Sequence, residues 1–267
     1  MDKIVLGQYI PGNSFIHRLD PRTKLISAVW FIVLIFMASH WWTVGLLLAT
    51  VIIAASLSKV PFKYYIDGIK PLMFLILITV SFQLIFSQGN TVIFELGWLR
   101  ITLEGIINAI VIMLRFVMIV LMSTILTLTT TPLEIADGIE ALLNPLKKFK
   151  VPVQEIALIL SIALRFVPTL LQETEKIMNA QRARGVDFSS GSIIERMKKV
   201  IPLLIPLFIS SIDRADQLAV AMTARGYRGG DSRTKLRQLI WKNIDTFVML
   251  YFLAVTILLF IGRFIIV

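Results

Sequence analysis

The sequence predicts an all-α integral membrane protein with about five transmembrane helices and long amphipathic cytoplasmic helices. Three observations lead to this prediction. Hydrophobic residues make up 57% of the 267-residue chain, and its mean hydropathy is +0.81. Only 16% of its residues are charged, whereas soluble domains carry about a quarter. The apolar residues form long runs or return every three or four positions, which is the pattern of helices.

The remaining composition narrows the class of function. The absence of cysteine excludes disulfides and thiolate chemistry. The two histidines, His17 and His40, are too few and too far apart for a usual zinc site, so we expect neither a metal nor a cofactor. A net charge of +10 would suggest nucleic acid in a soluble protein. In a membrane protein it is typical of basic cytoplasmic loops, and we expect no nucleic-acid partner.

The N-terminal residues 1–24 lack the pattern of a cleavable signal, so we expect the first span to remain as an anchor. This segment ends in the stretch Leu19-Asp20-Pro21-Arg22-Thr23-Lys24. Asp20 is a favourable N-cap and Pro21 suits the first position of a helix. The stretch therefore predicts a helix that begins at Pro21, with a basic flank on the cytoplasmic side.

Residues 25–58 carry no formal charge. One helix of this length would extend about 50 Å, which is too long for a single span of a ~30 Å hydrocarbon core. The group His40-Trp41-Trp42 lies near the middle, and tryptophan favours the membrane interface. We therefore predict two short spans, 25–39 and 41–58, joined by a tight outer turn.

Two further spans follow. A loop with Lys59, Lys63 and Lys70 is basic and hence cytoplasmic. The third span is predicted at 71–86 and the fourth at 103–130. Between these spans, residues 88–100 contain glycine and asparagine and are predicted to form a loop.

Arg115 interrupts the fourth span. An ionisable group at membrane depth is a candidate functional residue. The structural alternative, which we favour, is that Arg115 extends to the outer face or pairs with Glu104 or Glu95.

After Pro132 the uncharged runs become shorter, which favours interfacial or buried helices over spans. Residues 133–146 have apolar and acidic side chains on opposite sides of a helix. Two long helices are predicted at 153–184 and 193–225, each apolar at its start and polar at its end. The first is expected to bend at Pro168, and the second contains two prolines, Pro202 and Pro206.

The last span is predicted at 246–262. The chain then has an N-terminal membrane domain with four spans (1–130), a cytoplasmic domain with three helices (131–245) and a last transmembrane helix (246–267). The positive-inside rule places the N-terminus and the middle domain in the cytoplasm of a multi-pass cell-membrane protein, and the C-terminus outside.

The two long helices end in the same sequence. Ala183-Arg184-Gly185 and Ala224-Arg225-Gly226 align when the chain is shifted by 41 residues. Arginine in the last turn and glycine just beyond it are helix stop signals. Eleven residues before each arginine lie Glu173 and Arg214, which we expect to brace the two helices against each other. A lone arginine there would be explained by the helix dipole, but the duplication favours a shared function in docking a partner.

Catalysis is not expected. The chain has no phosphate-binding motif of the type G-x-x-x-x-G-K-[ST]. A serine nucleophile would need a base, and no buried base is apparent. Acidic residues are almost absent from the spans, which disfavours an ion-coupled carrier.

At the two arginine tips and in its N-terminal stretch, the chain resembles the transmembrane T component of energy-coupling factor (ECF) transporters, a branch of the ABC superfamily. The paired arginine tips match that family's X-Arg-X coupling motifs. The residues Asp20, Pro21, Arg22 and Lys24 look like its N-terminal signature. With the order of apolar runs, the resemblance covers essentially the whole chain.

The resemblance implies a non-catalytic scaffold that binds no ATP itself. Two cytoplasmic ATPase subunits would each receive one tip, at Arg184 and Arg225. The long helices would grip a membrane-embedded substrate-binding S component and transmit ATP-driven motion for uptake of a vitamin or metal ion. Pro168, Pro202 and Pro206 are candidate hinges in these helices, and fixed kinks due to packing are the open alternative.

Two other hypotheses stay open from the sequence. A self-sufficient channel or secondary carrier would place Arg115 in the pathway. A polytopic membrane enzyme would need a polar cluster at one membrane depth, which the sequence does not reveal.

Overall fold

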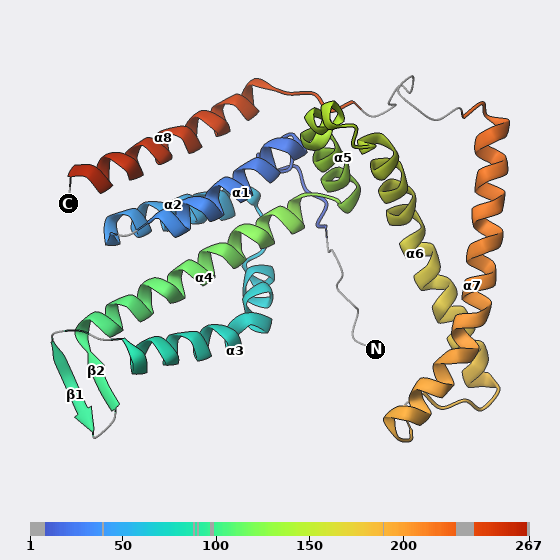
Figure 1. The fold of residues 1–267 in the computed structure, drawn as a ribbon, viewed down its shortest axis with the longest axis horizontal. Coiled ribbons are helices and arrows are strands. Elements are labelled where there is room, and N and C mark those ends of the chain that lie inside the picture. The colour runs from blue at the N-terminus through green and yellow to red at the C-terminus, as the bar shows by residue number, and fades with distance from the viewer. Residues whose placement is uncertain are drawn as a thin grey trace. The chain divides into compact units, whose positions relative to one another are not determined.

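The computed structural model in Figure 1 describes residues 9–38, 40–87, 89, 91–96, 99–188, 190–227 and 238–265. These residues are almost wholly helical, as the composition predicts. The elements in chain order are α1 (Pro21–Met37), α2 (Trp41–Ser58), α3 (Phe62–Phe86), β1 (Val92–Leu96), β2 (Leu99–Thr102), α4 (Leu103–Thr129), α5 (Pro132–Leu143), the 3-10 helix η1 (Asn144–Phe149), α6 (Val153–Ala183), α7 (Ile193–Ala224) and α8 (Asn243–Ile265).

The described chain divides into two compact units, one with the residues up to Leu142 and from Gln238 onward, and one with residues 143–237. Helices α1–α4 and α8 form the first unit, and α6 and α7 form most of the second. Helix α5 packs closely on α1 in the first unit. A Cβ built on Gly138 would lie only 2.8 Å from Cδ1 of Leu25, so glycine is what permits this approach.

The core of the first unit lies between α1, α2, α4 and α8. Helix α4 packs against α1, α2 and α3, while α8 packs on α1. The indole N–H of Trp30 donates to Oγ1 of Thr256 at 3.0 Å and joins α1 to α8. The core is almost entirely aliphatic, with phenylalanine and methionine, and its buried members are Phe31, Leu34, Ile35, Ala38, Val44, Leu47, Val51, Met118, Phe252, Val255 and Leu259.

The predicted break between the first two spans is confirmed. Helix α1 ends at its C-cap Ala38, and α2 begins after its N-cap His40. The side chain of Thr43 accepts the backbone N–H of His40 at 3.2 Å and thereby closes the first turn of α2. The start of α1 is also confirmed, because Oδ1 of the N-cap Asp20 accepts the backbone N–H of Arg22 at 2.9 Å.

Two local predictions need correction. Helix α3 begins at Phe62 and runs through Pro71, so residues 62–70, which were predicted to belong to a loop, are helical. Prolines are tolerated inside membrane helices because their neighbours satisfy the freed backbone groups. The predicted loop at 88–100 is largely an antiparallel hairpin in which β1 pairs with β2 in the register Glu95↔Arg100 and Leu96↔Leu99. The β-branched residues Val92 and Ile93 favour a strand there.

Five helices in the described part of the chain are long and apolar enough to cross a membrane, but they are not the five that the sequence predicts. They are α2, α3, α4, α6 and residues Asn243–Gly262 of α8. Helix α1 has 17 residues and extends only about 26 Å. Helix α6 qualifies because the apolar start of this 31-residue helix is long enough by itself.

The starts and ends of the bundle helices meet at one end of the first unit. The backbone N–H of Asp20 donates to Oδ1 of Asp245 at 2.8 Å, which joins the starts of α1 and α8. The ammonium of Lys24 donates to the carbonyl of Thr129 at 2.8 Å, which adds the end of α4. A buried cluster adds the end of α2 and the start of α3, and it contains Ile16, Val60, Tyr65, Ile125 and Leu128. Helices α1, α2, α3, α4 and α8 therefore alternate in direction.

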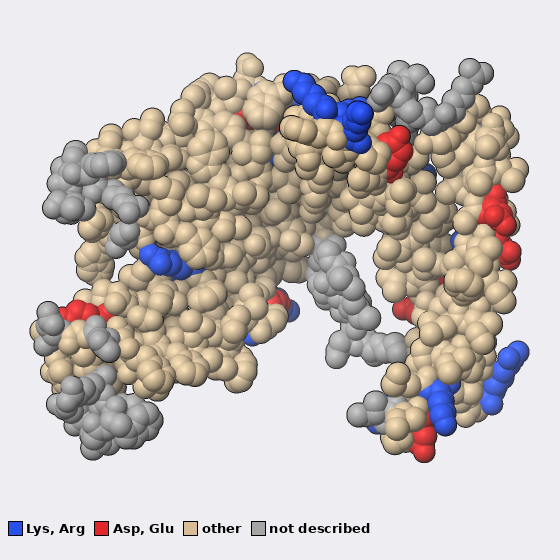
Figure 2. Space-filling view, viewed as in Figure 1, with Lys and Arg blue, Asp and Glu red and all other residues tan. Residues whose placement is uncertain are grey.

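The outer surface of this bundle is apolar. Figure 2 shows few charged side chains along its helices on the face in view. Large side chains such as Val29, Phe36 and Ile52 are exposed. Contiguous exposed apolar surface of this kind matches lipid as the surrounding solvent.

Candidate functional site

The two arginine tips of the second unit have the same backbone geometry. Arg184 is the C-cap of α6 with φ −84° and ψ 7°, and Arg225 is the C-cap of α7 with φ −86° and ψ 8°. The glycines that follow are left-handed, with φ +89° at Gly185 and +77° at Gly226. The sequence therefore places both helix stops correctly.

Both caps are Schellman motifs. The N–H of Gly185 donates to the carbonyl of Arg182 at 2.9 Å, and the next N–H reaches back from Val186 to Gln181 at 3.0 Å. At the second tip the N–H groups of Gly226 and Tyr227 donate to Thr223 and Met222 at the same two distances. These bonds satisfy carbonyls that a helix end leaves open. Each arginine is thus held on a defined backbone rather than on a frayed end.

The tips are open to a partner. All six residues Ala183, Arg184, Gly185, Ala224, Arg225 and Gly226 are exposed. Nothing lies within 4 Å of a Cβ built on either glycine. The alanine and glycine on either side of each arginine are small, so a partner surface can approach closely enough for the guanidinium to reach its carboxylates or carbonyls.

Helices α6 and α7 cross within the second unit (Figure 1), and an ion pair holds the crossing. One carboxylate oxygen of Glu173 accepts from Nη2 of Arg214 at 2.6 Å, and the other accepts from Oγ of Ser210 at 2.7 Å. The brace that the sequence predicts between Glu173 and Arg214 is therefore confirmed. Ser210, one turn before Arg214, was not foreseen.

The crossing joins equivalent positions of the repeat. Glu173 and Arg214 are 41 residues apart, which is also the separation of Arg184 and Arg225. Each arginine lies 11 residues beyond the crossing, or about 16 Å along its helix. We call these two segments, 173–184 and 214–225, the arms. They are of equal length and end in the same cap.

Before the crossing, both helices expose apolar side chains. Ile159 on α6 and Phe208 on α7 are 67% and 68% exposed. A wide groove of about 580 Å³ lies between the helices, lined mainly by apolar residues such as Leu170 and Leu204. The candidate hinges lie in this region, with Pro168 inside α6 and Pro202 and Pro206 inside α7. Each helix therefore combines an apolar half, which contains the prolines, with a polar arm.

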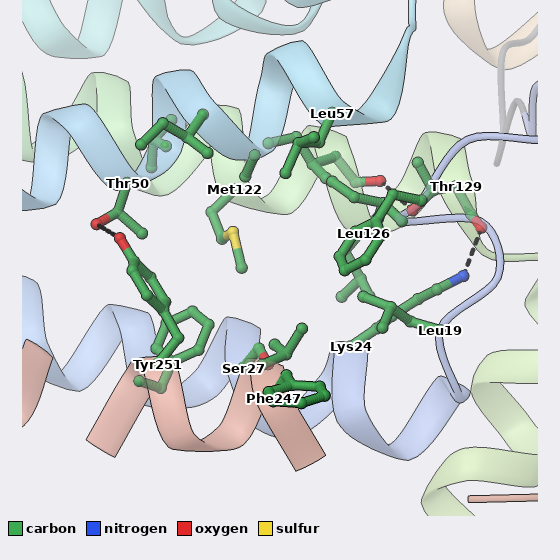
Figure 3. A pocket seen from close by; sticks show the side chains of 18 residues that line it. Leu19, Lys24, Ser27, Thr50, Leu57, Met122, Leu126, Thr129, Phe247 and Tyr251 are labelled. Atoms are coloured by element: carbon green, nitrogen blue, oxygen red, sulfur yellow. Dashed lines mark hydrogen bonds between the residues drawn. The ribbon is translucent and has the colours of Figure 1, made fainter. Parts of the chain in front are cut away.

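The N-terminal stretch has a structural role in the first unit. Asp20 caps α1, and its own N–H is held by Asp245, which is completely buried. Nη2 of Arg22 approaches the carbonyl of Leu239 at 3.5 Å, before the start of α8. The buried ammonium of Lys24 bonds the carbonyl of Thr129 (Figure 3). Together with Pro21 at the first position of α1, these residues fix where three helices begin or end.

The chain is similar to known proteins over nearly its whole length. A family model described as "Cobalt transport protein" matches residues 12–236, which include both tips and the N-terminal stretch. The energy-coupling factor transporter transmembrane protein EcfT of Streptococcus equi subsp. equi is 54% identical over 97% of this chain and 97% of its own. The EcfT proteins of Lactococcus lactis subsp. cremoris and Bacillus subtilis are 53% and 49% identical, over 97% and 98% of this chain and 97% and 99% of theirs.

The chain belongs to the EcfT family. It is a transmembrane component of energy-coupling factor transporters, and the resemblance inferred from the paired arginines is confirmed. The multi-pass membrane character predicted from composition agrees with this family and with the five apolar helices.

Arg115 extends to the turn between α1 and α2, which agrees with its expected structural role, and its partner there is a backbone carbonyl. Its Nη2 donates to the backbone carbonyl of Ala38, the C-cap of α1. A cation at this position also complements the negative end of the α1 dipole. The side chain of Glu95 lies outside the described residues. The contact gives Arg115 a structural role at the turn between α1 and α2.

Asp245 is the main site residue that the sequence did not single out. Its Oδ2 accepts the backbone N–H of Lys242 at 2.9 Å and its Oδ1 accepts that of Asp20, so one carboxylate caps α8 and holds α1. The sequence signal that could have identified Asp245 is an acidic residue at the start of an apolar run, where it can cap a helix. No cluster of three histidine, aspartate or glutamate side chains that could hold a metal was found in the described ranges.

Proposed function

We propose that this protein is the non-catalytic energy-coupling subunit of an ECF-type ABC importer. Two cytoplasmic ATPase subunits bind and hydrolyse ATP, and each receives one arm through Arg184 or Arg225. A membrane-embedded S component binds the substrate, a vitamin or a metal ion. The arms transmit the closing of the ATPase pair to the S component.

The observation that carries this proposal is the equivalence of the two arms. Both end in an exposed arginine on the same Schellman cap. The ion pair between Glu173 and Arg214 joins the two arms, and the 41-residue repeat makes these two positions equivalent. A pair of related sites on two related ATPase subunits would be matched by such a pair of equal tips. A single binding site would not need the duplication.

The exposed apolar halves of α6 and α7 support contact with the S component. Side chains such as Ile159 and Phe208 are too exposed to serve the core of this chain. A membrane-embedded partner would cover them. Pro168, Pro202 and Pro206 lie on the apolar side of the crossing and remain candidate hinges, because a proline removes one backbone hydrogen bond and loosens the helix there.

The proposed topology has five passes, formed by α1, α2, α3, α4 and α8, with the N-terminus and the second unit cytoplasmic and the C-terminus outside. Support comes from the end of the bundle where α1, α3 and α8 start and α2 and α4 end. That end carries the exposed cations Arg18, Lys59, Lys63 and Lys242, and basic residues mark the cytoplasmic side. The short α1 takes part because it packs directly on α4 and α8.

Charge reversal at the tips tests the proposal. We expect the double variant Arg184→Glu and Arg225→Glu to abolish co-purification of the ATPase subunits and coupled uptake while membrane insertion is unchanged. Arg182→Glu is the matched control, because Arg182 is an exposed cation of the same helix end but its counterpart in the second copy is Thr223. Uptake at the wild-type level in the double variant would refute the coupling role. Substrate flux through the purified chain alone in liposomes would instead indicate a channel or carrier.

A further inference from the structure

The first unit contains a cavity that the coupling function does not use. It has a volume of about 290 Å³ and lies between α2 and α8, against α1 and α4. Figure 3 shows its two ends. Thr50 and Tyr251 are joined by a hydrogen bond of 2.8 Å at one end, and Lys24 bonds Thr129 at the other. Met122 lies between them.

Between its two ends the wall of the cavity is apolar except at Ser27. Ser27 lines the cavity and is only 4% exposed, and among the described residues its buried hydroxyl has no hydrogen-bond partner. Burying a hydroxyl in this way is unfavourable unless a ligand completes its hydrogen bond. The buried ammonium of Lys24 lies one helical turn away in sequence and also lines the cavity. The site therefore offers a buried hydroxyl donor beside an apolar slot.

The mouth of the cavity is apolar and is flanked by cations. Phe15, Leu57 and Phe247 line it and are exposed. Two exposed basic residues are near these positions in the chain, Arg18 before Leu19 and Lys242 before the start of α8. The acidic residues that act on Lys24 are Asp20 and Asp245, which are buried and bonded inward, and the half-buried Glu134, which accepts the backbone N–H of Thr131. The exposed charges next to these lining residues in the chain are therefore cations, among them Arg18 and Lys242, which favours an anionic ligand.

The size and surroundings of the cavity limit the occupant. Its volume is roughly twice that of the ~150 Å³ apolar cavity that accepts benzene. An apolar slot does not hold water well, because a buried water needs two to four polar partners. The helices around it face hydrocarbon, so acyl chains are the molecules present at highest concentration.

We propose that this cavity binds one acyl chain of an anionic phospholipid. The ester carbonyl of the lipid accepts the hydroxyl proton of Ser27, and the phosphate group lies near Arg18 and Lys242. The bound chain fills the space between α2 and α8, so the lipid stabilises the contact of α8 with the rest of the bundle. The site is separate from the arms and does not depend on the proposed ATPase and S-component contacts.

The test counts lipids retained by the full-length chain. The protein is reconstituted into nanodiscs of equimolar phosphatidylglycerol and phosphatidylcholine, extracted in mild detergent and examined by native mass spectrometry. We expect one retained phosphatidylglycerol per chain. Ala54→Phe, which fills the cavity from α2, should reduce retention roughly tenfold or more. Ser27→Ala should reduce it roughly three- to tenfold.

Matched variants separate the cavity from nonspecific lipid binding. Ala49→Phe makes the same change at an exposed position of α2 outside the cavity lining and should retain lipid as wild type does. Arg18→Gln and Lys242→Gln should each lower the preference for phosphatidylglycerol about fivefold. If Ala54→Phe does not purify in a folded form, Ala54→Leu makes a smaller change at the same place.

Two results would overturn the proposal. Equal retention by wild type and the folded cavity-filling variant would show that the lipid is held elsewhere. Equal retention of phosphatidylglycerol and phosphatidylcholine by wild type would exclude an anionic lipid as the specific occupant.

Discussion

The two left-handed glycines allow a quantitative test of how the tips are held. Gly185 and Gly226 have φ of +89° and +77°, and a Cβ built on either meets nothing within 4 Å. Alanine therefore fits sterically at both sites, and only its backbone strain in the left-handed region remains. That strain is about 1–2 kcal/mol per residue. Because the two caps share no hydrogen-bond partner, the costs of the two substitutions should add.

Amide hydrogen exchange on the millisecond timescale measures this strain directly. In Gly185→Ala the N–H of Val186, which bonds the carbonyl of Gln181, should exchange roughly 5–30 times faster, the ratio that corresponds to 1–2 kcal/mol. The N–H of Tyr227 should not change. Gly226→Ala should give the reverse pattern, and asparagine should cost less than alanine at either site because it tolerates the left-handed region.

Gly45 provides the matched control. It also has open space around a built Cβ, but it lies inside α2 without a positive φ. Gly45→Ala should leave both tips unchanged and should stabilise α2 by about 0.5–1 kcal/mol. An unaltered exchange rate at Val186 in Gly185→Ala would refute the strain argument, and so would equal acceleration at both tips.

Three further predictions concern the first unit. Asp245→Ala should lower the free energy of unfolding by about 1–3 kcal/mol, because a buried N–H at the start of α1 loses its acceptor; Asp245→Asn retains an oxygen, and equal losses for both in denaturant unfolding would contradict this reason. Gly262→Ala should cost about 1–3 kcal/mol, because its Cβ would lie 1.6 Å from Cζ2 of Trp42; a double-mutant cycle with Trp42→Ala should show rescue, and simple additivity would count against the contact. Arg115→Gln should lower the melting temperature, because the carbonyl of Ala38 loses its donor, while the folded fraction keeps coupled uptake; normal stability with no uptake would instead assign Arg115 to transport.

The second unit was largely predictable from local sequence. Helix ends depend on a few neighbouring residues, so Arg184-Gly185 and Arg225-Gly226 locate both caps. The repeat of 41 residues also predicts that Glu173 and Arg214 are equivalent, and opposite charges at equivalent positions favour a crossing between them. Ser210 was missed because a serine one turn from an ion pair has no distinctive pattern.

The first unit was predictable as a set of helices but not in its contacts. The apolar runs predicted the spans that α2, α4 and α8 form, and the break between α1 and α2 at His40-Trp41 was predicted correctly. Residues 62–70 were predicted as a loop because Lys63 and Lys70 are charged, although a membrane helix can extend beyond its apolar span and accommodate a proline. The hairpin β1–β2 was missed because β1 begins with three consecutive apolar residues, Val92, Ile93 and Phe94, and does not alternate between apolar and polar ones.

Composition, periodicity and cap residues were enough to establish the membrane class, most helix bounds and the paired tips, since each depends on interactions within a turn or two of the chain. The partners of Asp20, Lys24 and Arg115 depended on the folded bundle. Asp20 and Asp245 are 225 residues apart, and many buried acceptors would satisfy a cation or an N–H equally well. Packing of α1, α4 and α8 selects among them, and the same packing leaves the cavity between α2 and α8.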